Sequence, residues 1–350
     1  MGKKRRAMTP YWPILMFLLL SGVRGACDGA SVVRVACNGV SVVRVSDGKL
    51  AAKDSPAFFD TFRDMVLNAD EVAGKVALIQ WGRHGSTIKI LGLKDGKCSK
   101  HTVPIGRENG LEGANYYDFS SDAYVLHDRN GLRFFPKKSK PREVPNVLPQ
   151  DYASSTMVPC EGGLLIGAAH GAVSDRFGVY YYLQSDNSMK KIYEASDGIR
   201  GLGSGGDHAI IVEDVKGDYR SRRILRIAFD GQVLSSVKAP ALSANTIQIK
   251  KDTLWEVGPY DSDRCQLQEE SLERGAVLQK VEFPDVPGRI TCFDVKNNIA
   301  VVGRSTDAGR TAEILDIKEK KILGRLSSNL SWSCLLLVKY NGEMYCVASD

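Results

Sequence analysis

The sequence predicts an all-β fold built from repeated sheets of four short strands. Beyond residue 70, apolar runs of four to seven residues alternate with turns rich in Gly, Asp, Asn and Ser, and this is the pattern of successive short strands. The runs form units that recur at about 40 residues, the length of one four-stranded sheet in a closed ring of sheets. Six such units follow one another, and the two chain ends supply strands for a seventh.

The strands of one unit follow a fixed order. Residues 74–103, GKVALIQWGRHGSTIKILGLKDGKCSKHTV, contain a strand, a turn with Arg and His, a second strand, an Asp-Gly turn and a third strand. Five later segments repeat this order. One more short strand precedes each unit, and examples are TMVPC at 156–160, NTIQI at 245–249 and RITCFDV at 289–295. Each unit therefore holds four antiparallel strands.

The chain ends complete the seventh unit. Residues 332–350, WSCLLLVKYNGEMYCVASD, supply two strands, and residues 26–45 repeat one decamer almost unchanged, as ACDGASVVRV and then ACNGVSVVRV. We predict that residues 30–35 form the third strand of this sheet and residues 40–45 the fourth. Strands from both ends then close the ring in one sheet, which removes the exposed edges of an open array.

This organisation resembles that of seven-bladed β-propellers over essentially the whole chain from residue 26 onward. The resemblance is architectural, because the Gly-His and Trp-Asp pairs of WD40 repeats are missing. STDAGRTA at 305–312 is similar to the Asp-box of sialidases, but it occurs once and Ala312 replaces the aromatic residue. The resemblance implies that loops between second and third strands, and loops between blades, share the face that binds ligands. We call it the loop face.

One segment predicts a helix. Ser55 is a suitable N-cap and Pro56 a suitable first helical residue, and apolar residues follow at helical spacing. We expect an amphipathic helix over residues 55–69, in the connection between the closing blade and the first complete blade.

The N-terminus has the pattern of a secretory signal peptide. Residues 1–25 combine a cationic start, an apolar run from Tyr11 to Leu20 and small residues. The run is shorter than the about 20 residues that span a bilayer, so we predict cleavage before Ala26, a secreted or lumenal location, and no stable membrane insertion afterwards. An uncleaved anchor is the alternative.

Charge and cysteine content limit the partners and cofactors. The net charge is +6, but the first 25 residues hold five basic and no acidic residues, which leaves 42 basic against 41 acidic. We therefore expect no nucleic-acid partner. Eight cysteines permit four disulfides in a secreted chain. Since no cysteine or histidine pattern has zinc spacing, we expect no metal and no cofactor. Asn329 begins a glycosylation sequon.

The candidate ligand-binding residues lie in the predicted loops between second and third strands. These loops are rich in Arg, His and Asp, which bind anionic or polyhydroxylated ligands through charge-assisted hydrogen bonds. The competing interpretation is that they are polar because they face water. The candidates are Arg83, His84, His127, Asp128, His170, Asp175, Arg176, Asp261, Arg304 and Asp307.

We predict a secreted β-propeller that acts as a binding module and engages a protein or glycan ligand on its loop face. The alternative is a propeller hydrolase that acts on a glycan or ester at the channel mouth, with His84, His127 or His170 beside an Asp. A structural coat or matrix component is a third interpretation.

Overall fold

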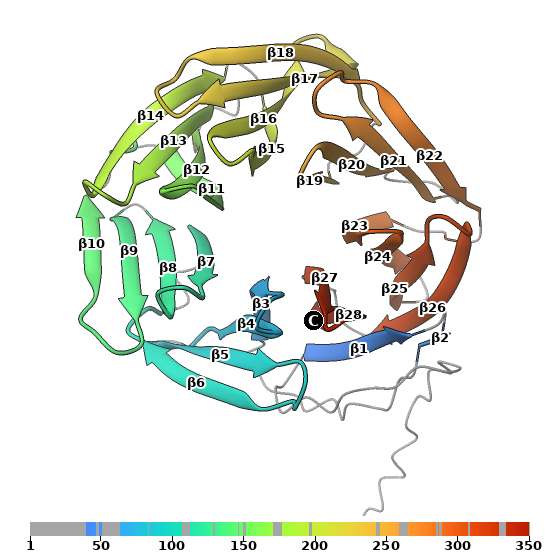
Figure 1. Ribbon diagram of the computed structural model, residues 1–350, viewed down its shortest axis with the longest axis horizontal. Coiled ribbons are helices and arrows are strands. Elements are labelled where there is room, and N and C mark those ends of the chain that lie inside the picture. The colour runs from blue at the N-terminus through green and yellow to red at the C-terminus, as the bar shows by residue number, and fades with distance from the viewer. Residues whose placement is uncertain are drawn as a thin grey trace, which may run out of the picture.

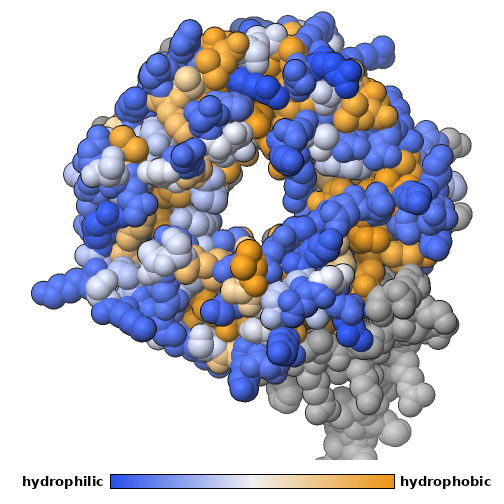
Figure 2. Space-filling model, viewed as in Figure 1, coloured by the Kyte–Doolittle hydropathy of each residue, from blue (hydrophilic) through white to orange (hydrophobic). Residues whose placement is uncertain are grey.

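The computed structural model is a ring of seven four-stranded antiparallel sheets around a central channel (Figure 1). The predicted seven-bladed β-propeller is confirmed. The channel stays open between the side chains (Figure 2). The structure describes residues 40–46, 49–50, 64–82, 84–106, 113–128, 130–145, 147–149, 152–170, 177–195, 198–242, 246–258, 265–284, 286, 289–306, 309–328 and 334–349.

Six complete blades follow one another, each with its first strand at the channel and its fourth at the rim (Figure 1). The first three contain β3 (Asp64–Asp70), β4 (Lys75–Gln80), β5 (Ser86–Gly92) and β6 (Cys98–Val103); β7 (Ala114–Asp118), β8 (Ala123–Asp128), β9 (Gly131–Pro136) and β10 (Arg142–Pro145); and β11 (Tyr152–Cys160), β12 (Gly163–His170), β13 (Phe177–Leu183) and β14 (Ser188–Ala195). The next three contain β15 (Ile199–Ser204), β16 (His208–Val215), β17 (Asp218–Ala228) and β18 (Val233–Pro240); β19 (Thr246–Lys250), β20 (Thr253–Gly258), β21 (Cys265–Ser271) and β22 (Val277–Phe283); and β23 (Arg289–Lys296), β24 (Ile299–Thr306), β25 (Gly309–Asp316) and β26 (Lys321–Ser328).

The closing blade joins the two ends of the chain in the order β2-β1-β28-β27. It contains β27 (Cys334–Tyr340), β28 (Glu343–Ser349), β1 (Val40–Ser46) and β2 (Lys49–Leu50). The second decamer is therefore the third strand of this blade, not the fourth as predicted, and it pairs with β28 and with β2. Two nearly identical decamers carry no signal for strand order, and a two-residue strand leaves no periodic pattern. Residues 30–35 lie outside the described residues.

The predicted helix over residues 55–69 needs a correction at its C-terminal end. Asp64–Asp70 is strand β3, which pairs with β4, and Val66 lies opposite Leu78. The pairing shifts register between Val66 and Asn68, and such a bulge interrupts the two-residue alternation that marks a strand. Residues 51–63 lie outside the described residues.

The core lies between the blades. Ile211 of β16 and Leu225 of β17 pack against Leu165 of β12 and Val179 of β13, and all four side chains are buried. The second and third strands thus have both faces covered by apolar neighbours. This explains why the sequence shows them as short continuous apolar runs.

Amide side chains link neighbouring inner strands around the channel. The Asn68 Nδ2 donates to the Tyr117 carbonyl at 2.8 Å, and the Tyr117 N–H donates to the Asn68 Oδ1 at 2.9 Å. Gln248 repeats this arrangement: its Nε2 donates to the Phe293 carbonyl at 2.7 Å and its Oε1 accepts from the Val295 N–H at 3.3 Å. The side chains thereby take the place of main-chain partners and fix β3 to β7 and β19 to β23.

Two sequence expectations concern cysteines and membranes. No disulfide joins any two of the five cysteines whose side chains the structure describes, and these are Cys98, Cys160, Cys265, Cys292 and Cys346. Within the described ranges, no helix is long and apolar enough to cross a membrane.

Candidate functional site

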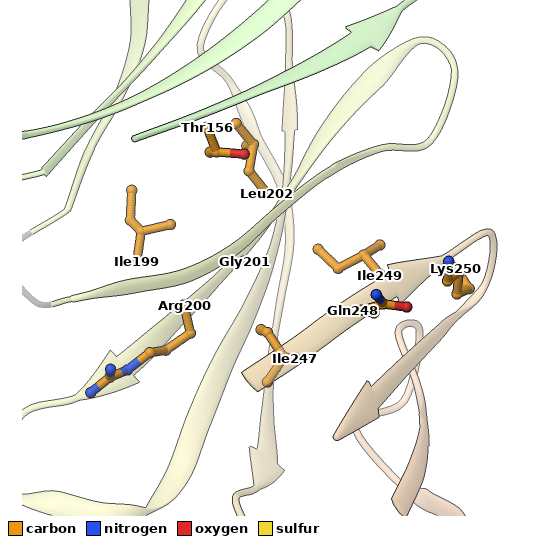
Figure 3. Close-up of a pocket in the computed structure, with 9 residues that line it drawn as sticks. All are labelled: Thr156, Ile199, Arg200, Gly201, Leu202, Ile247, Gln248, Ile249 and Lys250. Carbon is orange, nitrogen blue, oxygen red and sulfur yellow. The ribbon is translucent and has the colours of Figure 1, made fainter. Parts of the chain in front are cut away.

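A hollow in the channel wall is the candidate site, and we call it the channel groove. It lies among the inner strands β11, β15 and β19 and has a volume of about 420 Å³. Figure 3 shows its nine lining residues. They are Thr156, Ile199, Arg200, Gly201, Leu202, Ile247, Gln248, Ile249 and Lys250.

Two glycines let β19 approach β15 closely enough to form one wall. A Cβ atom added at Gly201 would lie 2.6 Å from the Ile247 Cδ1, and one added at Gly203 would lie 2.6 Å from the Ile249 Cγ2. Both distances are far below a van der Waals contact, so a larger residue at either position would displace the isoleucine that packs there. The contacts also fix the register, with Gly201 beside Ile247 and Gly203 beside Ile249.

A cation lies at each end of the groove. Arg200 follows the connection between two blades, so it lies at the loop face, and its Nε is 2.7 Å from the Asp214 Oδ2. Lys250 ends β19 at the opposite face, and its Nζ is 2.7 Å from the Oδ1 of buried Asp294. The Asp294 Oδ2 also accepts from the Leu337 N–H at 2.6 Å. Both cations are therefore positioned by carboxylates from neighbouring strands.

A buried polar network lies between the β15–β18 and β19–β22 blades. Arg222 of β17 pairs with Glu256 of β20, whose Oε2 also accepts from the Leu242 N–H at 2.7 Å. Burial lowers the pKa of Arg222 to about 10. On β21, the Gln268 Nε2 donates to Glu270, and burial raises the pKa of Glu270 above its usual range. Glu256 and Glu270 are both fully buried, and the Arg222–Glu256 pair is the contact of this network that joins the two blades.

The structure describes part of the predicted loop-face site. His127 and Asp128 end β8, and both side chains are buried. Burial lowers the pKa of His127 to about 4, so the imidazole is neutral at pH 7. Asp128 pairs with Arg133 and accepts from the Asn130 N–H at 2.8 Å. His84 is exposed, in the turn between β4 and β5. One histidine thus faces solvent and the other lies inside the protein.

Arg304 lies inside the fold. It belongs to β24, is fully buried, and lies near Cys265 of β21 and Glu313 of β25. His170 ends β12, but its side chain lies outside the described residues, as do all atoms of Arg83, Asp175, Arg176, Asp261, Asp307 and Asn329. The predicted ligand-binding set therefore stays a prediction. Among the residues that the structure describes, no group of three or more His, Cys, Asp and Glu side chains could hold a metal ion.

Sequence reasoning missed Arg200, Gln248 and Lys250 because all three lie within strands, whereas the candidate residues lie in segments that the sequence predicts to be loops. The sequence signal for the wall formed by β15 and β19 was GLGSGG at 201–206. This segment is not followed by a helix, so it is not a nucleotide-binding motif. Gly201 and Gly203 instead mark a close approach between two strands.

Comparisons with known proteins show the fold alone. No family model matches the sequence, and no curated protein matches it. The chain is similar in structure to an oligogalacturonate lyase in complex with manganese, with a TM-score of 0.59, 9% identity, and coverage of 92% of this chain and 96% of that chain. The computationally designed Ika8 protein gives a TM-score of 0.50 at 13% identity, over 93% of this chain and 98% of that chain. The class defined by fold and comparison is the β-propeller.

Proposed function

We propose that this chain is a secreted binding module whose protein ligand enters from the loop face and lies in the channel groove. The observation that carries the proposal is the groove itself, in which the apolar side chains Ile199, Leu202, Ile247 and Ile249 lie between two cations. Ligand sites combine an apolar surface with a few oriented polar groups in this way.

The lining favours a protein ligand over a glycan. None of the nine lining residues is aromatic, so the groove has no flat ring on which a sugar would stack. Aliphatic side chains instead match the apolar side chains of a peptide.

The proposal is tested by selection. The full chain, produced through a secretory pathway, is immobilised and challenged with a display library of random dodecapeptides and, separately, with a glycan array. Thr156→Trp places an indole at the groove, and Leu234→Trp places the same side chain on the rim strand β18, where Leu234 is exposed. Thermal unfolding of both variants verifies that they fold.

We expect the wild type and Leu234→Trp to enrich the same peptides and folded Thr156→Trp to enrich none. Equal enrichment by both variants, or no enrichment by any protein, overturns the proposal. Retention of glycans but not peptides replaces the protein ligand with a glycan.

Secretion rests on residues 1–25, which lie outside the described residues. Production in secreting cells with N-terminal sequencing of the product tests this part. A soluble product that begins at Ala26 supports it, whereas a retained product that begins at Met1 contradicts it.

A further inference from the structure

Under the proposed function, the two cations define the ligand more narrowly. The contacts of Gly201 with Ile247 and of Gly203 with Ile249 place Arg200 beside the first residue of β19, four residues before Lys250. At about 3.3 Å per residue, these two strand positions lie about 13 Å apart along the strand direction. We infer that the channel groove binds an extended peptide with acidic side chains four residues apart.

An extended conformation follows from the strands that form the groove. β15 and β19 are the terminal strands of their sheets on the channel side (Figure 1). A terminal strand presents one row of main-chain N–H and C=O groups, and an extended peptide recognises such a row through its own main chain. In an extended peptide, residues separated by four positions point to the same side, whereas residues separated by three point to opposite sides. Of these two spacings, the spacing of four is the one that presents both carboxylates to the same wall of the groove.

The two cations are accessible to a ligand while paired within the protein. The side chain of Arg200 is 38% exposed and that of Lys250 is 41% exposed. Guanidinium and ammonium groups carry several donors each. Asp294, the partner of Lys250, also accepts from the main-chain N–H groups of Val295 and Leu337, and a ligand carboxylate would share the Lys250 ammonium group with Asp294.

The charges around Lys250 favour an acidic ligand at that end. The next two inner strands carry Lys296 and Lys339, and the proximity of Lys339, after the larger effect of burial, lowers the pKa of Lys296. Glu71 pairs with Lys296 and accepts from the Lys339 N–H. Lys250, Lys296 and Lys339 thus lie on three consecutive inner strands, and their acidic partners Asp294 and Glu71 leave one positive charge in excess on this side of the ring.

Two isomeric probes test the spacing. Both are fluorescein-labelled nine-residue peptides of Val and Thr, one with Glu at its third and seventh positions and the other with Glu at its third and sixth. Binding to the full chain is measured by fluorescence anisotropy at low and high salt. We expect the four-residue spacing to bind about ten-fold more tightly, with a difference that shrinks in high salt. We expect Arg200→Gln and Lys250→Gln each to abolish that difference.

A charge exchange tests the inference by a gain of binding, which a folding defect cannot produce. Lys250→Glu should lose the preferred probe and bind the version whose corresponding Glu is changed to Lys. Equal binding of the two isomers, or no gain from the exchange, overturns the inference even if the display selection succeeds. If selected peptides still require an open groove but ignore acidic spacing, the proposed function stands and this inference fails. Tighter binding of an oligouronate than of either peptide also overturns it.

Discussion

Two interfaces between blades differ in the forces that hold them. Between the β3–β6 and β7–β10 blades, apolar side chains such as Ile79, Ile88 and Leu126 meet, all fully buried. Between the β15–β18 and β19–β22 blades, the apolar cluster is smaller, and Arg222 and Glu256 are buried beside it. Apolar contacts are non-directional, whereas a buried ion pair demands one geometry. The channel groove borders the interface that contains this ion pair.

The largest expected effect comes from breaking the buried ion pair. Arg222→Met leaves Glu256 as a buried carboxylate without its cation and should lower the free energy of unfolding by about 3–5 kcal/mol. Adding Glu256→Gln removes the negative charge and keeps an acceptor for the Leu242 N–H, so the double variant should recover more than half of the loss. Urea unfolding followed by tryptophan fluorescence measures both changes. Equal losses in the single and double variants would show that charge does not control this interface.

A smaller effect is expected at the apolar interface. Ile79→Val removes one buried methyl group and should lower the free energy of unfolding by about 1 kcal/mol. The loss should not change with salt or between pH 5 and pH 7, because no charged group is removed. Urea unfolding at these conditions provides the measurement, and a loss that varies with salt would contradict the assignment of this interface as apolar.

The smallest effect concerns pH at the charged interface. Burial raises the pKa of Glu270 above the ordinary value of 4.5, so the folded state holds this proton more tightly than the unfolded state. That contribution to stability is complete below the unfolded pKa and is lost as the pH rises through the folded pKa. Glu270→Gln should therefore stabilise the protein at pH 7 relative to the wild type, with little difference at pH 4. Thermal unfolding across this range tests it, and a constant difference would contradict the cause given.

The sequence was sufficient for the architecture because each blade repeats the same local pattern. Second and third strands such as β12 and β13 are buried on both faces and form clear apolar runs. The predictions were wrong where the local pattern was weak. The strand order of the closing blade was missed because β2 has two residues, and the start of the first blade was missed because the bulge in β3 breaks its alternation.

The candidate site was harder to predict because it depends on contacts distant in sequence. Arg200 and Lys250 are separated by an entire blade and meet one groove only after β19 packs on the two glycines of β15. His127 and Arg304 have residue types typical of binding sites, yet their strands turn both side chains into the interior. Residue type indicates what a side chain is able to bind, whereas packing determines whether a ligand reaches it.

The pairing of β1 with β28 also determines the order in which the ring can form during biosynthesis. Val42 lies opposite Val347, about 300 residues later in the chain. At about 5–20 residues per second, a ribosome needs at least about 15 s to make the intervening segment. During that time β1 waits without its partner strand, and the six complete blades can assemble only as an open arc. Substitutions in β1 should therefore act on the last step of maturation, when a newly made arc becomes a ring.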